Sequence, residues 1–452
     1  MENKNLKKGL YRLATPIFFE LLFIMTLGIV DTLMLSKYSD NAVGAVSNAN
    51  TIISFLIVLL NVVSVGIGVV ISNHLGAGNK EFAKKAISTG VFFNLSLGLI
   101  LLITFQFGGE FLFTIIDTDK AFLDYSVNYM KIVTFGIPLL AINGVLSASL
   151  RSHGKPLHIM VVTIISNLIN VFVNYVLIYD KFNTGISLIT GVNGAAIGTL
   201  ISHIFNFTCS VILTKKLIGA KLFSLNIDFE CFRQIIKIGL PSAFENVTYN
   251  VSQVLVMKVV NNLPNAVIAV NTRAYIMTLI GFIYQFSCAF ANANQIIVGY
   301  DIGEGNYKKA YKDTYKAYFS AIPIVMLMVL ILNIFARPFL DILTDNEEII
   351  ELGIKVLPMV FLLEFGRTFN LVFIQALKAA GDTIYPLIGG VICMLLIASG
   401  GSYIFGLKLQ MGLLGVFLAY GLDETIRGIF MVIRWNSKKW ESKSLIKHPN
   451  IE

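Results

Sequence analysis

The segment that most constrains this chain is Pro16–Leu35, which reads PIFFELLFIMTLGIVDTLML. It is apolar and long enough for a helix that crosses a bilayer. Two acids stand within it, Glu20 and Asp31, although a carboxylate inside a membrane helix costs roughly 2.5–3.5 kcal/mol on insertion scales. The acids are eleven residues apart, so at about 100° per residue they lie within roughly 20° of one helix face. The pattern predicts that this face lines a water-filled cavity where a cation is taken up and released.

The composition of the chain sets the class of protein. Of its 452 residues 56% are hydrophobic and 14% are charged, whereas soluble domains average about 45–50% and 25%. Long apolar runs, without the short alternating segments of a membrane barrel, predict an all-α polytopic membrane protein. The start MENKNLKKGLYRLATP lacks a signal-peptide cleavage pattern, so we expect the first helix to remain a span. The four scattered cysteines indicate neither a disulfide framework nor a zinc site.

The apolar runs divide the chain into twelve predicted transmembrane helices, and the basic residues test that number. Counted at the nearer end of each span, 24 Lys and Arg fall on the side of the N-terminus and 8 on the other side. Such an excess is typical of the cytoplasmic side, so we expect a plasma-membrane protein with both termini in the cytoplasm. The predicted spans are about 11–35, 50–73, 87–106, 125–149, 157–179, 192–214, 235–260, 267–298, 314–335, 353–377, 384–406 and 412–433.

The second half of the chain repeats the first, with matching segments 224 to 227 residues apart. Six spans per half predict two pseudo-symmetric six-helix lobes related by an axis along the membrane normal, which alternate access to a site between them. We place the N-lobe at 1–214, a cytoplasmic linker at 215–234, the C-lobe at 235–434 and a basic tail at 435–452. The matching pairs include NAVGAV at 41–46 with NAVIAV at 265–270, Arg151 with Lys378, and Pro16 and Glu20 with Pro241 and Glu245.

Most charged residues inside the predicted spans have an opposite charge nearby. An acid and a base three or four residues apart can neutralise each other on one helix face, which favours a structural role. Lys131 can extend along its stem to the membrane interface. The paired residues are Glu364, Arg367, Asp423, Glu424 and Arg427.

Three acids have no such partner on their own helix: Glu20, Asp31 and Glu245. An unpaired acid in this setting favours cation binding or protonation. For Glu20 and Glu245 a second interpretation is a carboxyl bonded to a neighbouring helix, where it holds the first span of each lobe in place.

The fifth and sixth predicted spans supply neutral oxygens. Asn170 and Asn174 share a helix face, and so do the Thr199 hydroxyl and the Ala195 carbonyl. With Asp31 they would form an all-oxygen site of net charge −1, which suits Na⁺ better than Zn²⁺. The two asparagines taken alone are equally typical of hydrogen bonds between packed helices.

Motifs along essentially the whole chain, in the correct order, resemble one transporter family. They are Val30-Asp31-Thr32, Gly76-Ala-Gly-Asn79, Leu150-Arg151…Gly154, the Asn170/Asn174 pair, Gly239-Leu-Pro241 and Leu377-Lys-Ala-Ala-Gly-Asp-Thr383…Pro386. The family is multidrug and toxic compound extrusion (MATE). The resemblance implies twelve spans in two lobes and export of organic cations driven by inward Na⁺ or H⁺. It also implies an N-lobe cation site made by Asp31, Asn170, Asn174, Ala195 and Thr199, with Asp31 as the essential acid.

Two positions depart from the family pattern. Some members have an aspartate where this chain has Asn174. One bacterial branch has an acid at the position of Tyr249, so a C-lobe cation site of that type is not expected here. Glu245 lies one turn earlier.

The leading hypothesis is a secondary active multidrug antiporter, with Glu20, Asp31 and Glu245 as substrate-binding or coupling residues. We expect small organic cations and membrane lipids as partners, no nucleic acid, a monomer, and no cofactor besides the transported ion. Alternatives are a flippase for lipid-linked oligosaccharides of the same superfamily and a membrane protein that does not transport. The chain has no HExxH or Walker motif, so we expect neither an enzyme nor ATP as the energy source.

Overall fold

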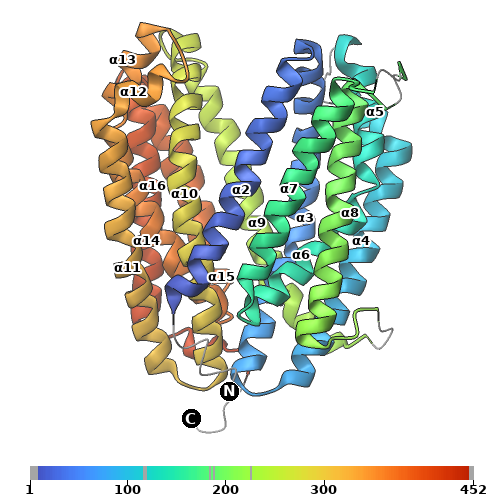
Figure 1. The fold of residues 1–452 in the computed structure, drawn as a ribbon. Coiled ribbons are helices and arrows are strands. Elements are labelled where there is room, and N and C mark those ends of the chain that lie inside the picture. The colour runs from blue at the N-terminus through green and yellow to red at the C-terminus, as the bar shows by residue number, and fades with distance from the viewer. Residues whose placement is uncertain (1–8, 116–119, 183–184, 187–188, 224–226, 447–452) are drawn as a thin grey trace. The chain divides into compact units, whose positions relative to one another are not determined.

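The computed structural model of the chain describes residues 9–115, 120–182, 185–186, 189–223 and 227–446. Parts of the predicted linker and of the basic tail, at 224–226 and 447–452, lie outside the described residues. Within the described ranges the chain forms helices joined by turns and has no strand (Figure 1), which confirms the all-α prediction.

The helices follow the predicted spans. The helix α2 (Leu10–Ser36) carries Asp31, and α7 (Pro156–Ile178) and α8 (Gly191–Ile218) carry the predicted neutral oxygens. Two π-helical segments, Met394–Gly400 and Ser402–Lys408, continue α15. The other helices are α3 (Asp40–Gly76), α4 (Lys80–Ile115), α5 (Lys120–Thr134), α6 (Ile137–Ser152), α9 (Phe229–Val260), α10 (Ala266–Gly303), α11 (Tyr307–Ile334), α12 (Ala336–Asp341), α13 (Glu347–Val356), α14 (Met359–Ala379), α15 (Ile384–Cys393) and α16 (Gly412–Asn436).

Length and composition identify the segments that cross the membrane. In the part of the chain that the structure describes, nine helices are long and apolar enough to do so. The helices α5 and α6 bend by 50° at their junction and together make a tenth span. The helices α9 and α16, of 32 and 25 residues, also have the length of a span but contain more charged residues. With these two, the chain has the twelve transmembrane helices that the sequence predicts.

Packing groups the chain into two units. The first-half unit comprises Phe19–Ile71 and Asn79–Gly239. The second-half unit comprises Met1–Phe18, Ser72–Gly78 and Leu240–Glu452. Because the units are defined by packing, the second-half unit also contains two segments from the first half of the chain. The lobe boundaries given in the sequence analysis stay a prediction.

In the first-half unit, an apolar core forms among α3, α4, α5, α6 and α8. The buried Asn94 side chain on α4 donates to the carbonyls of Leu60 on α3 (3.3 Å) and Ala141 on α6 (2.8 Å), and so ties three helices together. A small residue brings α7 and α8 together, because a Cβ at Gly194 would overlap the backbone of Leu177. The polar faces of these two helices are therefore in contact.

In the second-half unit, α14 and α16 lie in close contact. Gly366 on α14 touches Thr425, and Gly428 on α16 touches Phe369, with no room for a Cβ at either glycine. The adjoining core is formed by apolar side chains of α9, α10, α11, α14 and α16. This close approach explains how the charged residues of α14 and α16 meet inside an apolar unit.

Candidate functional site

The Asp31 carboxylate on α2 faces two buried amides of α7. Asn174 Nδ2 donates to Asp31 Oδ1 at 2.9 Å and to Asn170 Oδ1 at 2.9 Å. Both asparagines are 1% exposed, whereas Asp31 is half-buried. The site is therefore closed on the side of α7 and accessible on the side of the carboxylate.

Two further hydrogen bonds hold α7 against α2 on either side of Asp31. Asn167 Nδ2 donates to the Phe23 carbonyl at 2.8 Å, and the Tyr179 hydroxyl donates to the Met34 carbonyl at 2.9 Å. Because both bonds end on the backbone of α2, they fix the height of the asparagines relative to Asp31.

The Asn170 amide fits its surroundings in two orientations. In one, its oxygen accepts from Asn174 and lies 3.0 Å from Asp31 Oδ1. In the other, its nitrogen donates to Asp31 Oδ1 at 3.0 Å and its oxygen accepts from the Thr199 backbone N–H at 3.3 Å. Two oxygens in contact repel each other, so the second orientation, with the amide nitrogen on the carboxylate, is the one that the neighbouring groups favour.

The remaining predicted residues extend this network onto α8. The Thr199 hydroxyl donates to the Ala195 carbonyl at 3.0 Å. Hydrogen bonds thus connect Asn174 to Asp31 and Asn170, and Thr199 to Ala195. In the second orientation of Asn170, its bond from the Thr199 backbone N–H joins these two groups. That they bind a cation stays a prediction.

Tyr129 on α5 belongs to the same network, and sequence reasoning missed it. Its hydroxyl is hydrogen-bonded to Thr199, and it lies within electrostatic range of Asp31. The residue is 6% exposed. In the sequence a buried tyrosine at helical spacing looks like any other core aromatic, and no local pattern connects it to Asp31.

A glycine on α8 makes room for Asn174. A Cβ at Gly198 would overlap the Asn174 side-chain oxygen. That oxygen is buried and has no hydrogen-bond partner among the described residues. The amide whose nitrogen binds the Asp31 carboxylate therefore keeps a buried oxygen without a donor, on the side of α8.

The charge of Asp31 is not balanced by a base. In the described part of the chain its side chain bonds to Asn174 and forms no ion pair with Lys, Arg or His. A carboxylate with neutral partners in an apolar helix retains its affinity for a proton or a monovalent cation.

Comparisons with known proteins show the family to which the chain belongs. The sequence profile of the MatE family matches residues 16–176 and 241–404, which together make up most of the chain. The chain belongs to the MatE family. This MATE protein is 31% identical to the transporter YisQ of Bacillus subtilis (strain 168) over 441 residues, 97% of this chain and 96% of that protein.

Other relatives extend the likeness to named drug transporters and to solved structures. The MATE chain is 25% identical to a probable multidrug resistance protein NorM of Thermotoga maritima, over 100% of its own length and 97% of NorM. Its fold matches the outward-facing structure of a multidrug resistance MATE family transporter with a TM-score of 0.85, at 20% identity, covering 96% of this chain and 97% of that one. The predicted family and fold are confirmed: the chain is a membrane transporter and not an enzyme.

The structure corrects one inference about two acids of this MATE transporter. Glu20 and Glu245 were inferred to be unpaired from the spacing on their own helices. Arg151 on α6 forms an ion pair with Glu20 at 2.8 Å, and Lys378 on α14 forms one with Glu245 at 2.9 Å. The partners come from other helices, and spacing within one helix cannot show them.

The two ion pairs stand at matching positions of the repeat. In each half an acid one turn after a proline in the first span binds a base in the last turn of a later helix. This favours the second interpretation, in which Glu20 and Glu245 hold the first span in place. Their part in coupling stays a prediction.

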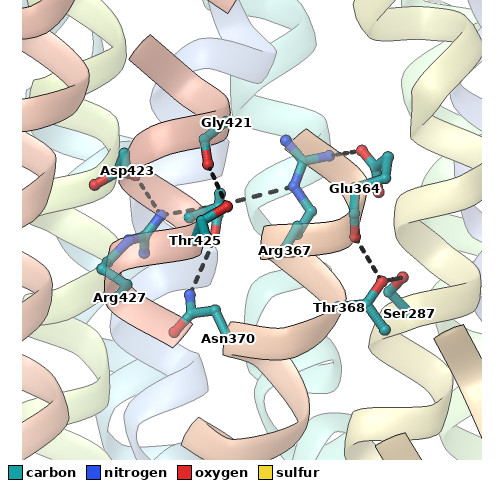
Figure 2. Close-up of polar contacts among 10 residues, drawn as sticks. Ser287, Glu364, Arg367, Thr368, Asn370, Gly421, Asp423, Thr425 and Arg427 are labelled. Carbon is teal, nitrogen blue, oxygen red and sulfur yellow. Dashed lines mark hydrogen bonds and ion pairs between the residues drawn. The ribbon is translucent and has the colours of Figure 1, made fainter. Parts of the chain in front are cut away.

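A group of five charges joins α14 to α16 in the second-half unit (Figure 2). Arg427 contacts Asp423 at 2.6 Å and Glu424 at 2.9 Å. Arg367 is paired with Glu364 and reaches across to Glu424 at 3.7 Å. The pairings predicted along each helix are present, and the contact between the helices joins them into one cluster. We call these five residues the α14–α16 charge cluster.

A groove on the helices α2 and α7 offers room for a small molecule, and Asp31 is not among the residues that line it. It lies along α2 and α7 within the first-half unit and has a volume of about 750 Å³, within the range of small-molecule sites. Apolar and aromatic side chains form most of it, and Lys37 and Lys181 contribute its charges. The apolar and aromatic residues are Val30, Leu33, Met34, Leu168, Val171, Phe172, Tyr175 and Tyr179.

Proposed function

We propose that this MATE transporter is a secondary active antiporter that exports organic cations in exchange for inward Na⁺ or H⁺. One observation carries the proposal. Asp31 lies in an apolar helix, its carboxylate meets only neutral groups among the described residues, and the amide side chains of Asn170 and Asn174 on α7 lie in contact with it. Such a carboxylate is costly unless it periodically binds a positive charge.

The proposed ion site consists of Asp31, Asn170, Asn174, Ala195 and Thr199. An inward monovalent cation gains about 2.3 kcal/mol per 100 mV of membrane potential. The ion and the drug exchange because each changes the affinity for the other, either through competition at Asp31 or through preference for different states. The multidrug resistance named in relatives such as NorM supports a drug as the second ligand.

The groove along α2 and α7 supports a flat, apolar cation as cargo. The Lys181 ammonium lies 4.9 Å from the centroid of the Tyr175 ring, so a cation can occupy the face of this ring. A bound organic cation would take the place of Lys181 on this ring of α7, in the groove that α7 forms with α2.

Transport by purified protein in vesicles tests the proposal. We expect outward movement of ethidium when a Na⁺ or a pH gradient is imposed alone, and the gradient that works identifies the ion. Asp31→Asn should remove this movement without changing insertion or folding, because the amide keeps the shape but not the charge. Glu110→Gln, which changes an exposed acid of α4, is the matched control and should transport normally.

Two results would contradict the proposal. Ethidium transport by Asp31→Asn at the level of the unchanged protein would remove the central role of this carboxylate. Movement of a lipid-linked oligosaccharide, with none of ethidium, would favour a flippase of the same superfamily.

A further inference from the structure

The α14–α16 charge cluster carries more negative than positive charge. Three carboxylates meet two guanidinium groups, so one negative charge is left when all five side chains are ionised. Each of the five residues is at most 8% exposed. A net charge buried in this way costs several kcal/mol and favours uptake of a proton.

No further base contacts the carboxylates of the cluster in the described part of the chain. Arg273 on α10 donates to Gln253 at 2.8 Å and to the Tyr420 hydroxyl at 3.0 Å, and it pairs with no carboxylate among the described residues. Lys378 is already paired with Glu245. The other titratable groups that face the cluster are ordinarily neutral side chains: Tyr249 on α9, Tyr284 and Cys288 on α10, and Cys393 on α15.

Two carboxylate oxygens of the cluster lack a donor in the part of the chain that the structure describes. They are Glu364 Oε2 and Asp423 Oδ1, and both are buried. Asp423 differs from Glu364 because it lines a small cavity between α9, α14 and α16, together with Arg367 and Glu424. The cavity has a volume of about 10 Å³, close to the space that one water molecule needs.

We propose that Asp423 takes up and releases one proton through this cavity, as a second titratable site of the transporter. The proton binds to Oδ1, which has no donor, while Oδ2 keeps its hydrogen bond from Arg427 at 2.6 Å. Uptake neutralises the cluster and release restores its negative charge. The role of this proton in transport rests on the antiport proposed above.

A proton fits the site better than a metal ion does. Two guanidinium groups lie against the carboxylates and repel a metal cation. Within the described residues, no group of three or more His, Cys, Asp or Glu side chains could hold a metal ion. The cavity is also too small for a hydrated ion.

Infrared difference spectroscopy on the purified full-length protein in lipid tests the proposal without using transport. We expect a carboxylic-acid C=O band that disappears as the pH is raised. One component of this band should persist in Asp31→Asn and in the exposed-acid control Glu110→Gln and should be lost in Asp423→Asn, while the components of the other acids remain. Asp423→Glu restores a carboxyl group and should restore a titrating band, which covers the case in which the amide variant folds poorly.

Three outcomes would overturn the assignment. The first is an unchanged band in Asp423→Asn. The second is a band lost in Glu364→Gln but not in Asp423→Asn, which would place the proton on α14. The third is a failure of Asp423→Glu to restore the titrating component that Asp423→Asn removes. None of these outcomes depends on whether Asp31 drives antiport, so the two proposals can fail separately.

A transport measurement then tests the use of the proton. Ethidium efflux driven by an imposed pH gradient should fall by about 5-fold or more in Asp423→Asn, in the range of typical coupling between ligand sites. Ethidium binding at fixed pH should remain, because Asp423 lies outside the proposed ion site. Full pH-driven efflux in this variant would contradict a role for the proton in coupling.

Discussion

At the scale of single residues, the neighbours of Asp31 decide what it can do. Glu20 and Asp31 are both on α2. Arg151 on α6 neutralises Glu20, whereas Asp31 meets the neutral side chain of Asn174 and keeps its charge. Spacing along the helix correctly indicated that Asp31 has no basic partner among the described residues, but it missed the partner of Glu20. A partner on another helix depends on packing, which the spacing does not contain. Tyr129 was missed for the same reason, since it reaches the site only through Thr199.

Gly198→Ala tests how tightly the site is built. The new Cβ overlaps the Asn174 oxygen, and overpacking of this kind costs about 1–3 kcal/mol. Alanine recovers about 1 kcal/mol of helix propensity, so the protein should fold while binding of the coupling ion weakens. Ion-dependent protection against heating of the purified protein measures this loss.

Gly28→Ala is the matched control for this substitution, because Gly28 lies on α2 with open space around its Cα. It should leave ion binding unchanged or stabilise the fold slightly. Equal ion binding by Gly198→Ala and the unchanged protein would show that Asn174 does not need its present position.

At the scale of helices, the same ion pair occurs once in each half. Glu20 binds Arg151 and Glu245 binds Lys378, and each acid follows a proline by four residues. A proline removes one backbone hydrogen bond from the helix interior, so a bond from a neighbouring helix one turn later restores support to the first span. The repeat in the sequence predicted the matching positions, and the fold decided that acid and base meet.

Exchange of the charges tests this role of Glu20 and Arg151. Removing one partner of a buried pair costs about 3–5 kcal/mol, so Glu20→Gln and Arg151→Gln should each lower the melting temperature and the efflux of ethidium. The double variant Glu20→Arg with Arg151→Glu should recover much of both. If it transports no better than the single variants, the carboxylate is needed at position 20 itself.

The exposed pair Glu81 and Lys84 provides the control, with its charged atoms 3.5 Å apart. Surface pairs contribute about 0–1 kcal/mol, so Lys84→Gln should change neither the melting temperature nor the efflux.

At the scale of the whole molecule, twelve apolar segments and the uneven distribution of basic residues predict the path of the chain through the membrane. The fold confirms the helices, and the family places the chain among transporters. The direction of insertion remains a prediction of the positive-inside rule.

Labelling of single cysteines tests this direction. In a variant without the native cysteines, Lys181→Cys should react with a membrane-impermeant maleimide in intact cells, because the rule places it outside. Lys308→Cys should react only after the membrane is opened, because the rule places it in the cytoplasm. The reverse pattern would show that the chain is inserted in the opposite direction.

The spans, the repeat and the carboxylate in the first helix can all be predicted from the amino-acid sequence. These are local properties, because a helix in lipid satisfies its own backbone and needs only a sufficient run of apolar residues. The tertiary structure decided which charges meet: Glu20 with Arg151, and Arg367 with Glu424. Gly366 and Gly428 allow the close approach of α14 and α16 that brings Arg367 to Glu424, and no spacing along one helix contains that information.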